Sequence, residues 1–295
     1  MSKKNLKDGI SYLIPSYNHS KYIVYLLDSI LKDIELLNQD AEIILIDDGS
    51  IDNTKEVLDN WLLKNISSIK IEFIYQSNKG LNATLNRLIS LSSFKFLRLC
   101  GSDDIIVPGS SKIMHSCILD NSLLIAVSGD GYVIDSEGKR THESSIKHHR
   151  GRIEKLINPK LLNNEIILNW CLTGPSTLIK RSHFDNVSYD ENEIIDDFFL
   201  FLSIVNQNGL KIIPDKVNEY RIHNTNMSKT KDLEKRLRNQ KSFLNCILSF
   251  KEMENKYPSL SAVRNLTEAK IAYLEKNYFK CFLKIINYFY FRIKV

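Results

Sequence analysis

The chain of 295 residues has few of the residues that cross-link or interrupt a fold: five cysteines, six prolines and 11 glycines. The cysteines are odd in number, stand far apart and form no Cys-x-x-Cys pair. This excludes a disulfide framework and predicts reduced thiols in a reducing compartment. Hydrophobic residues make up 43% and charged residues 25% of the chain, which also excludes disordered and collagen-like classes.

Long hydrophobic runs are absent too. No segment approaches the roughly 18 consecutive apolar residues of a membrane span. The charged residues 1–8 are not followed by an apolar stretch of signal-peptide length. We therefore expect a cytoplasmic protein, or one attached to a membrane only at its surface.

Positive charge is concentrated at the end of the chain. Residues 229–295 contain 15 lysines and arginines against six acidic residues, whereas residues 1–228 contain 25 against 29. A nucleic-acid-binding protein more usually carries Lys and Arg across its main binding face, with aromatic residues between them. The slightly acidic larger part therefore argues against nucleic acid as a partner.

The first third of the chain alternates β-prone runs with helix-like stretches. The β-prone runs are residues 10–14, 42–46, 69–75 and 94–99, and the helix-like stretches lie near residues 21–37, 52–63 and 81–91. This spacing predicts parallel βαβ units, whose ligands bind at the carboxyl ends of the strands.

The rest of the chain is predicted to be more mixed. We expect short strands at residues 123–128 and 176–179, helices at 152–170 and 196–206, and an exposed, mobile loop at 136–151 that includes His148 and His149. From residue 229 onward the sequence is helical in character throughout.

Paired carboxylates follow the apolar strand 94–99. Asp103 and Asp104 should project from the strand end into the ligand crevice. Hard divalent cations take one or two carboxylates from a protein together with phosphate oxygens from a substrate, so the pair suits a nucleoside-diphosphate site. Taken alone, it is more easily explained as a turn that caps the next helix.

Together with other segments, however, the pair resembles the family-2 inverting glycosyltransferases with the GT-A fold, over roughly residues 9–228. The matching segments occur in the family's order. They are Ile14-Pro15-Ser16-Tyr17-Asn18, Ile46-Asp47-Asp48-Gly49-Ser50-Ile51-Asp52, Asn78-Lys79-Gly80 with Asn86, Gly101-Ser102-Asp103-Asp104, Asp196-Asp197-Phe198-Phe199-Leu200 and Tyr220-Arg221-Ile222-His223-Asn224-x-Asn226-x-Ser228.

Two departures from the family pattern stand out. Gly101 replaces the first aspartate of the metal-binding Asp-x-Asp, and Asp196 replaces the glutamate before the expected base. The first makes Asp103 the expected metal ligand, with Asp104 beside it. The second keeps a carboxylate but shortens its side chain.

The resemblance implies an α/β GT-A architecture followed by a C-terminal helical extension. Residues 1–228 would form the glycosyltransferase domain, with a nucleotide-sugar half at about 1–106 and an acceptor half at 107–228. Residues 229–295 would form a helical, basic and aromatic region.

The resemblance also implies a set of donor contacts. Pro15 and Tyr17 would line the base pocket, Asp48 would accept a hydrogen bond from the base, and Arg221 would close over the diphosphate. A divalent metal, Mn²⁺ or Mg²⁺, would be held by Asp103, Asp104 and His223. The full set of expected nucleotide-binding residues is Pro15, Tyr17, Asn18, Asp48, Asn78, Gly80, Asn86, Ser102, Asp103, Asp104 and Arg221. Turn formation and helix capping explain several of these nearly as well, and Asp47 stays open.

Asp197 is the expected general base. Inverting transfer needs one carboxylate to take the proton of the acceptor hydroxyl while a metal holds the leaving diphosphate. It requires no covalent intermediate. The alternative is that Asp196 and Asp197 only begin a helix, where negative charge suits the helix dipole. Both functions are compatible.

The last 18 residues combine aromatic, aliphatic and basic side chains with no acidic residue. Such an amphipathic helix suits the headgroup layer of an anionic membrane, and packing against protein is nearly as good an explanation. A membrane contact would favour a lipid-linked glycan acceptor, and hence a bacterial surface polysaccharide such as O antigen or capsule.

Other enzyme classes with an α/β fold would require motifs of their own. A dehydrogenase would need Gly-x-Gly-x-x-Gly and a P-loop enzyme Gly-Lys-Ser/Thr, and neither sequence occurs. A nucleotidyltransferase acting on sugar phosphates, or a non-catalytic scaffold of a polysaccharide assembly complex, remains an alternative. The resemblance favours UDP as the donor nucleotide, with dTDP and GDP as alternatives.

Overall fold

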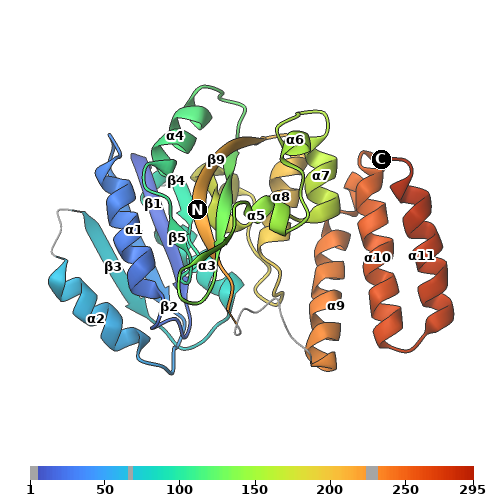
Figure 1. The fold of residues 1–295 in the computed structure, drawn as a ribbon, viewed down its shortest axis with the longest axis horizontal. Helices are drawn as coiled ribbons and strands as arrows, with labels where there is room; N and C mark the ends of the chain where they lie inside the picture. Colours follow the sequence, from blue (N-terminus) through green and yellow to red (C-terminus); the bar gives the residue numbers. More distant parts are fainter. Residues whose placement is uncertain (1–5, 66–68, 224–231) are drawn as a thin grey trace.

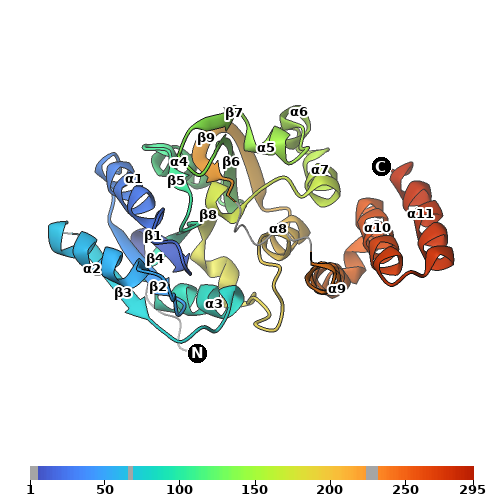
Figure 2. The same ribbon diagram turned by 60° about the horizontal axis from the view of Figure 1, so that its bottom comes forward.

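The computed structural model describes residues 6–65, 69–223 and 232–295 (Figure 1). One mixed sheet of nine strands, in the order β3-β2-β1-β4-β8-β6-β9-β5 with β7 paired to β6, runs through it. Helices cover both faces of this sheet, and three C-terminal helices lie beyond one end of it (Figure 2). The predicted α/β class is confirmed.

The first third of the chain folds as three βαβ units. Strands β1 (Lys7–Ser16), β2 (Ala41–Asp47), β3 (Lys70–Tyr75) and β4 (Phe94–Leu99) pair in parallel, joined by α1 (Ile23–Glu35), α2 (Thr54–Lys64) and α3 (Leu81–Leu91). The alternation of periods in the sequence therefore predicted this part correctly. Parallel pairing brings the carboxyl ends of all four strands to one edge.

The middle of the chain returns through the same sheet. It contains β5 (Ile105–Ile106), α4 (Ser110–Leu119), β6 (Ala126–Ile134), β7 (Arg140–His142), α5 (Ser145–His148), α6 (Ile153–Leu156), α7 (Leu162–Asn169), β8 (Thr177–Lys180), α8 (Asp197–Asn206) and β9 (Leu210–Arg221). Strand β8 pairs antiparallel with both β4 and β6, whereas β9 runs parallel to β6 and ends beside β5.

The structure differs from several expectations for this middle part. Residues 137–143 are exposed as expected, but the segment 136–151 also contains β7 and α5, where Ile146 is buried and His148 and His149 are half-buried. The helix expected at 152–170 is broken into α6 and α7, with Pro159 in the break. Strand β6 extends past two glycines to Ile134, and β9 was not predicted.

The C-terminal region is helical over its described part, as predicted. Helices α9 (Leu233–Ser249), α10 (Pro258–Leu274) and α11 (Tyr278–Arg292) lie side by side (Figures 1 and 2). Phe243 of α9 stacks on Trp170, with ring centroids 5.1 Å apart, and so ties this region to the sheet domain.

The predicted domain boundary at residues 228–229 lies outside the described residues. In the part of the chain that is described, no helix combines the length and apolarity that crossing a membrane requires.

A buried network of charged and polar groups connects β1, β4, α1 and β9. Arg98 on β4 and Asp33 on α1 are both fully buried, with Nη1 and Oδ2 3.7 Å apart, and Tyr12 donates a 2.7 Å hydrogen bond to Asp33. Arg98 also donates to the carbonyl of Val217 on β9 at 2.6 Å. A buried charge that lost its partner would be strongly destabilising, so this network fixes β9 against the first half.

The buried His183 predicts a pH-dependent stability. Its Nε2 lies 2.8 Å from Oγ of Ser203, and burial lowers the pKa of His183 from 6.5 to about 4. The unfolded chain therefore binds a proton more readily, so the contribution to stability is complete above pH 6.5 and is lost as the pH falls toward 4. We expect this residue alone to lower the free energy of unfolding by about 2 kcal/mol between pH 7 and pH 5.

Urea unfolding of wild type and His183→Gln at pH 7 and pH 5 measures this effect. The variant should lose less stability on acidification than the wild type. His142→Gln, at an exposed histidine, controls for the removal of a histidine elsewhere. Equal losses in wild type and His183→Gln would contradict the assignment.

Candidate functional site

The loops after β1 and β2 are locked together at the carboxyl edge of the sheet. Asn18, with φ of 55°, accepts a 2.8 Å hydrogen bond at Oδ1 from the backbone N–H of Ile51 and donates its own N–H to Oγ of Ser50. Oγ of Ser50 in turn donates to Asp47. Asn18 and Asp47 therefore shape the rim of the site, whatever else they contact.

Asp48 organises the next turn. Its carboxylate accepts hydrogen bonds from Nε2 of Gln76 at 2.7 Å and from the backbone N–H groups of Lys79 and Gly80 at 2.8 and 2.9 Å. Gly80 has φ of 89°, a conformation that glycine adopts without strain, and α3 begins after it. The structure thus gives Asp48 a turn-holding task beside the base contact predicted for it, and that base contact stays a prediction.

Some of the other expected nucleotide-binding residues are accessible to a ligand, and one is engaged in protein contacts. Tyr17 and Asn78 are exposed and Pro15 is half-buried, so each has surface to offer a ligand. Asn86 differs from the expectation, because its amide is engaged elsewhere. Its Nδ2 donates to the carbonyl of Tyr189 and its Oδ1 accepts from the N–H of Tyr189. Asn86 therefore anchors the loop before α8 rather than facing a diphosphate.

Arg221 is engaged in contacts within the protein. Its buried guanidinium donates from Nε to the carbonyl of Asp103 at 2.7 Å and from Nη1 to the carbonyl of Asp135 at 3.0 Å, and it lies 4.9 Å from the ring of Tyr22. The backbone N–H of Arg221 donates to Oδ1 of Asp104 at 2.8 Å. Arg221 thus positions the Asp103–Asp104 turn, and its contact with a diphosphate stays a prediction.

One group of side chains has the composition of a metal site. His19, Asp103 and His223 place one ligand atom each within 4.8 Å of one another. Nε2 of His223 lies 2.8 Å from Oδ2 of Asp103, and Nδ1 of His19 lies 2.6 Å from Oγ of Ser102. The three residues lie in the segments that directly follow β1, β4 and β9. Residues 224–228 of the last motif lie outside the described residues.

His19 was not among the residues predicted from the sequence, whereas Asp104 was. His19 directly follows the strand-end motif that ends at Asn18, so its position was the available signal. Asp104 lies outside the group of ligand atoms because its carboxylate accepts the Arg221 N–H. Asp103 and His223 lie together, whereas Asp104 as a second metal ligand stays a prediction.

The protonation states suit a cation. Burial lowers the pKa of His19, which keeps its imidazole neutral as a ligand must be. Burial raises the pKa of Asp103, but its hydrogen bond with His223 helps to hold that pKa below its usual value. Two imidazoles and one carboxylate fit Mn²⁺ better than Mg²⁺, because Mg²⁺ prefers an all-oxygen shell.

Asp197 lies at the start of α8, near enough to Asp104 for its charge to raise the pKa of that carboxyl. Its Oδ1 accepts a 2.7 Å hydrogen bond from the N–H of Gly174. A Cβ at Gly174 would lie 3.9 Å from Cβ of Leu99, the last residue of β4, so this carboxylate lies beside the strand end that carries Asp103. Burial and the charge of Asp196 raise the pKa of Asp197 well above its usual value. A carboxylate with a raised pKa is a stronger base.

Trp170 and Gly174 lie in the segment that connects α7 to β8. Trp170 packs on Phe243 and Phe198, which explains it by packing alone. Gly174 has a specific reason to be glycine: a Cβ there would lie 2.7 Å from Oδ1 of Asp197. Glycine at this position therefore lets Asp197 approach the backbone.

A family model described as "Glycosyl transferase family 2" matches residues 11–188. This is more than half of the chain, and the chain belongs to that family. The match spans the strands that carry His19 and Asp103 but ends before Asp197, Arg221 and His223.

Curated relatives are distant. Glycosyltransferase GlyG of Streptococcus pneumoniae is 25% identical over 65% of this chain and 63% of its own length. Abequosyltransferase RfbV of Salmonella typhimurium is 27% identical over 68% and 62%. The chain therefore covers less than two thirds of the length of these relatives.

Solved structures confirm the expected GT-A fold. Staphylococcus aureus TarS 1–349 in complex with UDP-GlcNAc superposes with a TM-score of 0.60 at 16% identity, covering 95% of this chain and 89% of that one. Mannosyltransferase PcManGT of Pyrobaculum calidifontis, in complex with GDP-Man and Mn²⁺, gives a TM-score of 0.63 at 12% identity, covering 96% and 75%. At these identities the likeness shows the fold alone.

Metal titration distinguishes the two aspartates. Asp103→Asn removes a ligand carboxylate, so we expect the affinity for Mn²⁺ to fall about tenfold or more. Asp104→Asn keeps an oxygen that can accept the Arg221 N–H, so it should change the affinity much less, and His19→Ala should resemble Asp103→Asn. Electron paramagnetic resonance of free Mn²⁺ measures all three. An equal loss in Asp104→Asn and Asp103→Asn would show that Asp104 is a ligand too.

Proposed function

We propose that this chain is an inverting glycosyltransferase that moves a sugar from a nucleoside-diphosphate donor, a UDP-sugar, to a hydroxyl of a glycan acceptor. The observation that carries the proposal is that the His19–Asp103–His223 group follows strand ends at the edge of the sheet where Asp197 also lies beside the end of β4 and acts electrostatically on Asp104. Membership of glycosyl transferase family 2 and the likeness to a fold seen with UDP-GlcNAc support it.

The chemistry needs only these groups. The acceptor oxygen forms a bond to the anomeric carbon while the bond from that carbon to the donor phosphate oxygen breaks. Asp197 takes the hydroxyl proton, and the electron pair leaves with the nucleoside diphosphate. A divalent cation, when bound, neutralises the charge on that leaving group. Asp103, His19 and His223 would hold it, and Arg221 keeps Asp103 in position from behind.

The acceptor and location belong to the same proposal. A TarS described as a poly(ribitol-phosphate) β-N-acetylglucosaminyltransferase and a minor teichoic acid biosynthesis protein, GgaA, are among the relatives at 25% and 28% identity. We propose a lipid-linked glycan of O-antigen or capsule type as acceptor. The protein would then work as a peripheral protein on the inner face of the cytoplasmic membrane.

Asp197→Asn tests the base. Removing the general base should slow sugar transfer by about 10²–10⁴-fold. The variant should still gain thermal stability from UDP with Mn²⁺, because the residues of the metal group are intact. Asp196→Asn is the matched control. Removing the Asp196 charge lowers the pKa of Asp197, so the acidic limb of the pH–rate profile should shift to lower pH.

UDP release from a panel of UDP-sugars, in the presence of Mn²⁺, measures the rate. GDP and dTDP serve as alternative ligands in the thermal unfolding arm. If UDP release is unchanged in Asp197→Asn, the base assignment is wrong. If no nucleotide raises the unfolding temperature of the wild type, the non-catalytic scaffold becomes the better explanation.

The outer face of α11 is the proposed membrane contact. Phe279, Phe282, Ile286, Phe289 and Ile293 follow one another at spacings of three and four residues, and all are exposed. Lysines and arginines flank this stripe, and residues 278–295 contain no acidic side chain. Two copies meeting through this face would bring like charges together, whereas an anionic lipid surface complements them.

Vesicle binding tests the contact. Phe282→Ser with Phe289→Ser removes two apolar side chains from the stripe, so binding to vesicles containing phosphatidylglycerol should weaken roughly tenfold or more. Leu123→Ser, at an exposed apolar residue outside the C-terminal region, is the matched control. Co-sedimentation measures both. Unchanged binding in the double variant would show that α11 is not the membrane contact.

A further inference from the structure

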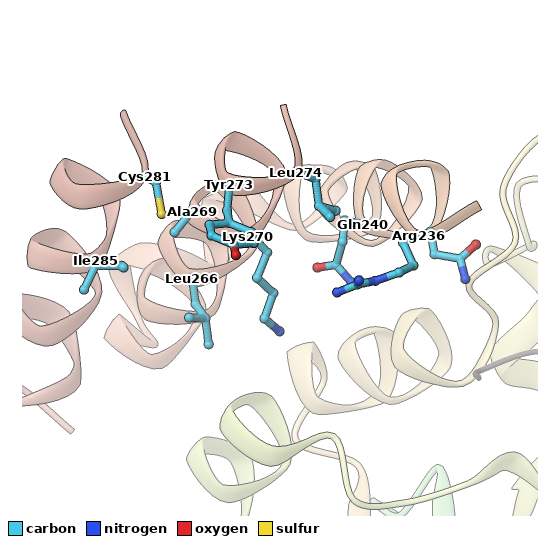
Figure 3. Close-up of a pocket in the computed structure, with 10 residues that line it drawn as sticks. Arg236, Gln240, Leu266, Ala269, Lys270, Tyr273, Leu274, Cys281 and Ile285 are labelled. Atoms are coloured by element: carbon cyan, nitrogen blue, oxygen red, sulfur yellow. The ribbon is translucent and has the colours of Figure 1, made fainter. Parts of the chain in front are cut away.

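A pocket of about 520 Å³ lies among the three C-terminal helices (Figure 3). Helix α9 contributes Arg236, α10 contributes Lys270 and α11 contributes Ile285. The glycosyl transfer proposed above uses none of the side chains that line it. Those residues are Arg236, Asn239, Gln240, Leu266, Ala269, Lys270, Tyr273, Leu274, Cys281 and Ile285.

The polar side of the pocket is positive. The side chains of Arg236 and Lys270 extend into the same space in Figure 3. No aspartate or glutamate lines the pocket, and among the described residues neither cation forms an ion pair with a carboxylate. Oε1 of Gln240 is buried and has no hydrogen-bond partner in the described part of the chain. The pocket therefore presents two uncompensated positive charges and an acceptor that needs a donor.

The surroundings of Lys270 make its charged form costly when no anion is bound. Burial, together with the positive charge of Arg150, lowers the pKa of Lys270. Both effects disfavour the charged ammonium, and a bound anion would relieve them. The site thus has a physical reason to take a negatively charged group.

The rest of the wall is apolar. Leu266 and Ala269 on α10 and Ile285 on α11 lie along it (Figure 3). A free inorganic anion would leave this surface uncovered, whereas a ligand with an alkyl part would bury it. Charge on one side and hydrocarbon on the other indicate an anionic amphiphile.

We propose that this pocket binds the phosphate-bearing end of an anionic membrane lipid, with the phosphate at Arg236 and Lys270 and the adjoining alkyl chain against α10 and α11. The pocket and the proposed membrane contact share helix α11, because Ile285 of that helix lines the pocket. The inference rests on that contact, and it adds to it a specific lipid site.

Calorimetric titration of the full chain with three soluble probes tests the site. Decyl phosphate, kept below its critical micelle concentration, carries both the charge and the alkyl chain. Inorganic phosphate carries only the charge, and decyl maltoside carries only the alkyl chain. We expect the wild type to bind decyl phosphate at least tenfold more tightly than either of the others.

The variants localise the binding. Arg236→Gln with Lys270→Gln should weaken decyl phosphate binding at least tenfold while leaving stabilisation by UDP and Mn²⁺ unchanged. Lys235→Gln with Lys280→Gln is the matched control, because it removes the same charge from α9 and α11 outside the pocket lining. The control should bind decyl phosphate as the wild type does.

Several results would overturn the proposal. Equal binding of decyl phosphate by wild type and the pocket variant would do so, and so would equal affinity for decyl maltoside. A wild-type dimer that the pocket variant loses would show that a second copy occupies the pocket. The membrane contact is judged separately: if Phe282→Ser with Phe289→Ser abolishes vesicle binding but keeps decyl phosphate binding, the lipid site and the membrane contact both stand.

Discussion

The path of β9 across the fold is held by two buried arginines. Arg98 on β4 donates to the carbonyl of Val217, and Arg221 at the end of β9 donates to the carbonyl of Asp103. Because both arginines are buried and their partners are fixed backbone groups, β9 has one place to end. His223 is thereby brought within 2.8 Å of Asp103, although 120 residues separate them.

The surroundings of the three carboxylates Asp103, Asp104 and Asp197 give them different pKa shifts. Asp103 has a pKa below its usual value and faces two imidazoles, whereas burial and the charge of Asp103 raise the pKa of Asp104, which accepts the Arg221 N–H. Asp197, at the start of α8, has a raised pKa. All three residues are aspartates, so burial and neighbouring charges, not residue type, set the difference between their pKa values.

Prediction from the sequence succeeded for elements whose hydrophobic pattern and packing depend on residues nearby in the sequence. The strands and helices up to Leu99 follow from hydrophobic periods, since each βαβ unit buries its own apolar faces. It failed where pairing is distant. The strand predicted at 123–128 found only the start of β6, which continues through two glycines, and β9 was not predicted because its partners lie far away in the sequence.

The sequence by itself determined the α/β class, the family, the order of the polar strand-end segments and the helical, basic C-terminal region. Only the tertiary structure decided which side chains meet. It brought His19 to Asp103, turned Asp104 toward the Arg221 backbone and engaged Asn86 with the loop at Tyr189. The physical reason is that hydrogen-bond partners and burial depend on contacts between distant segments, and residue type alone does not specify those contacts.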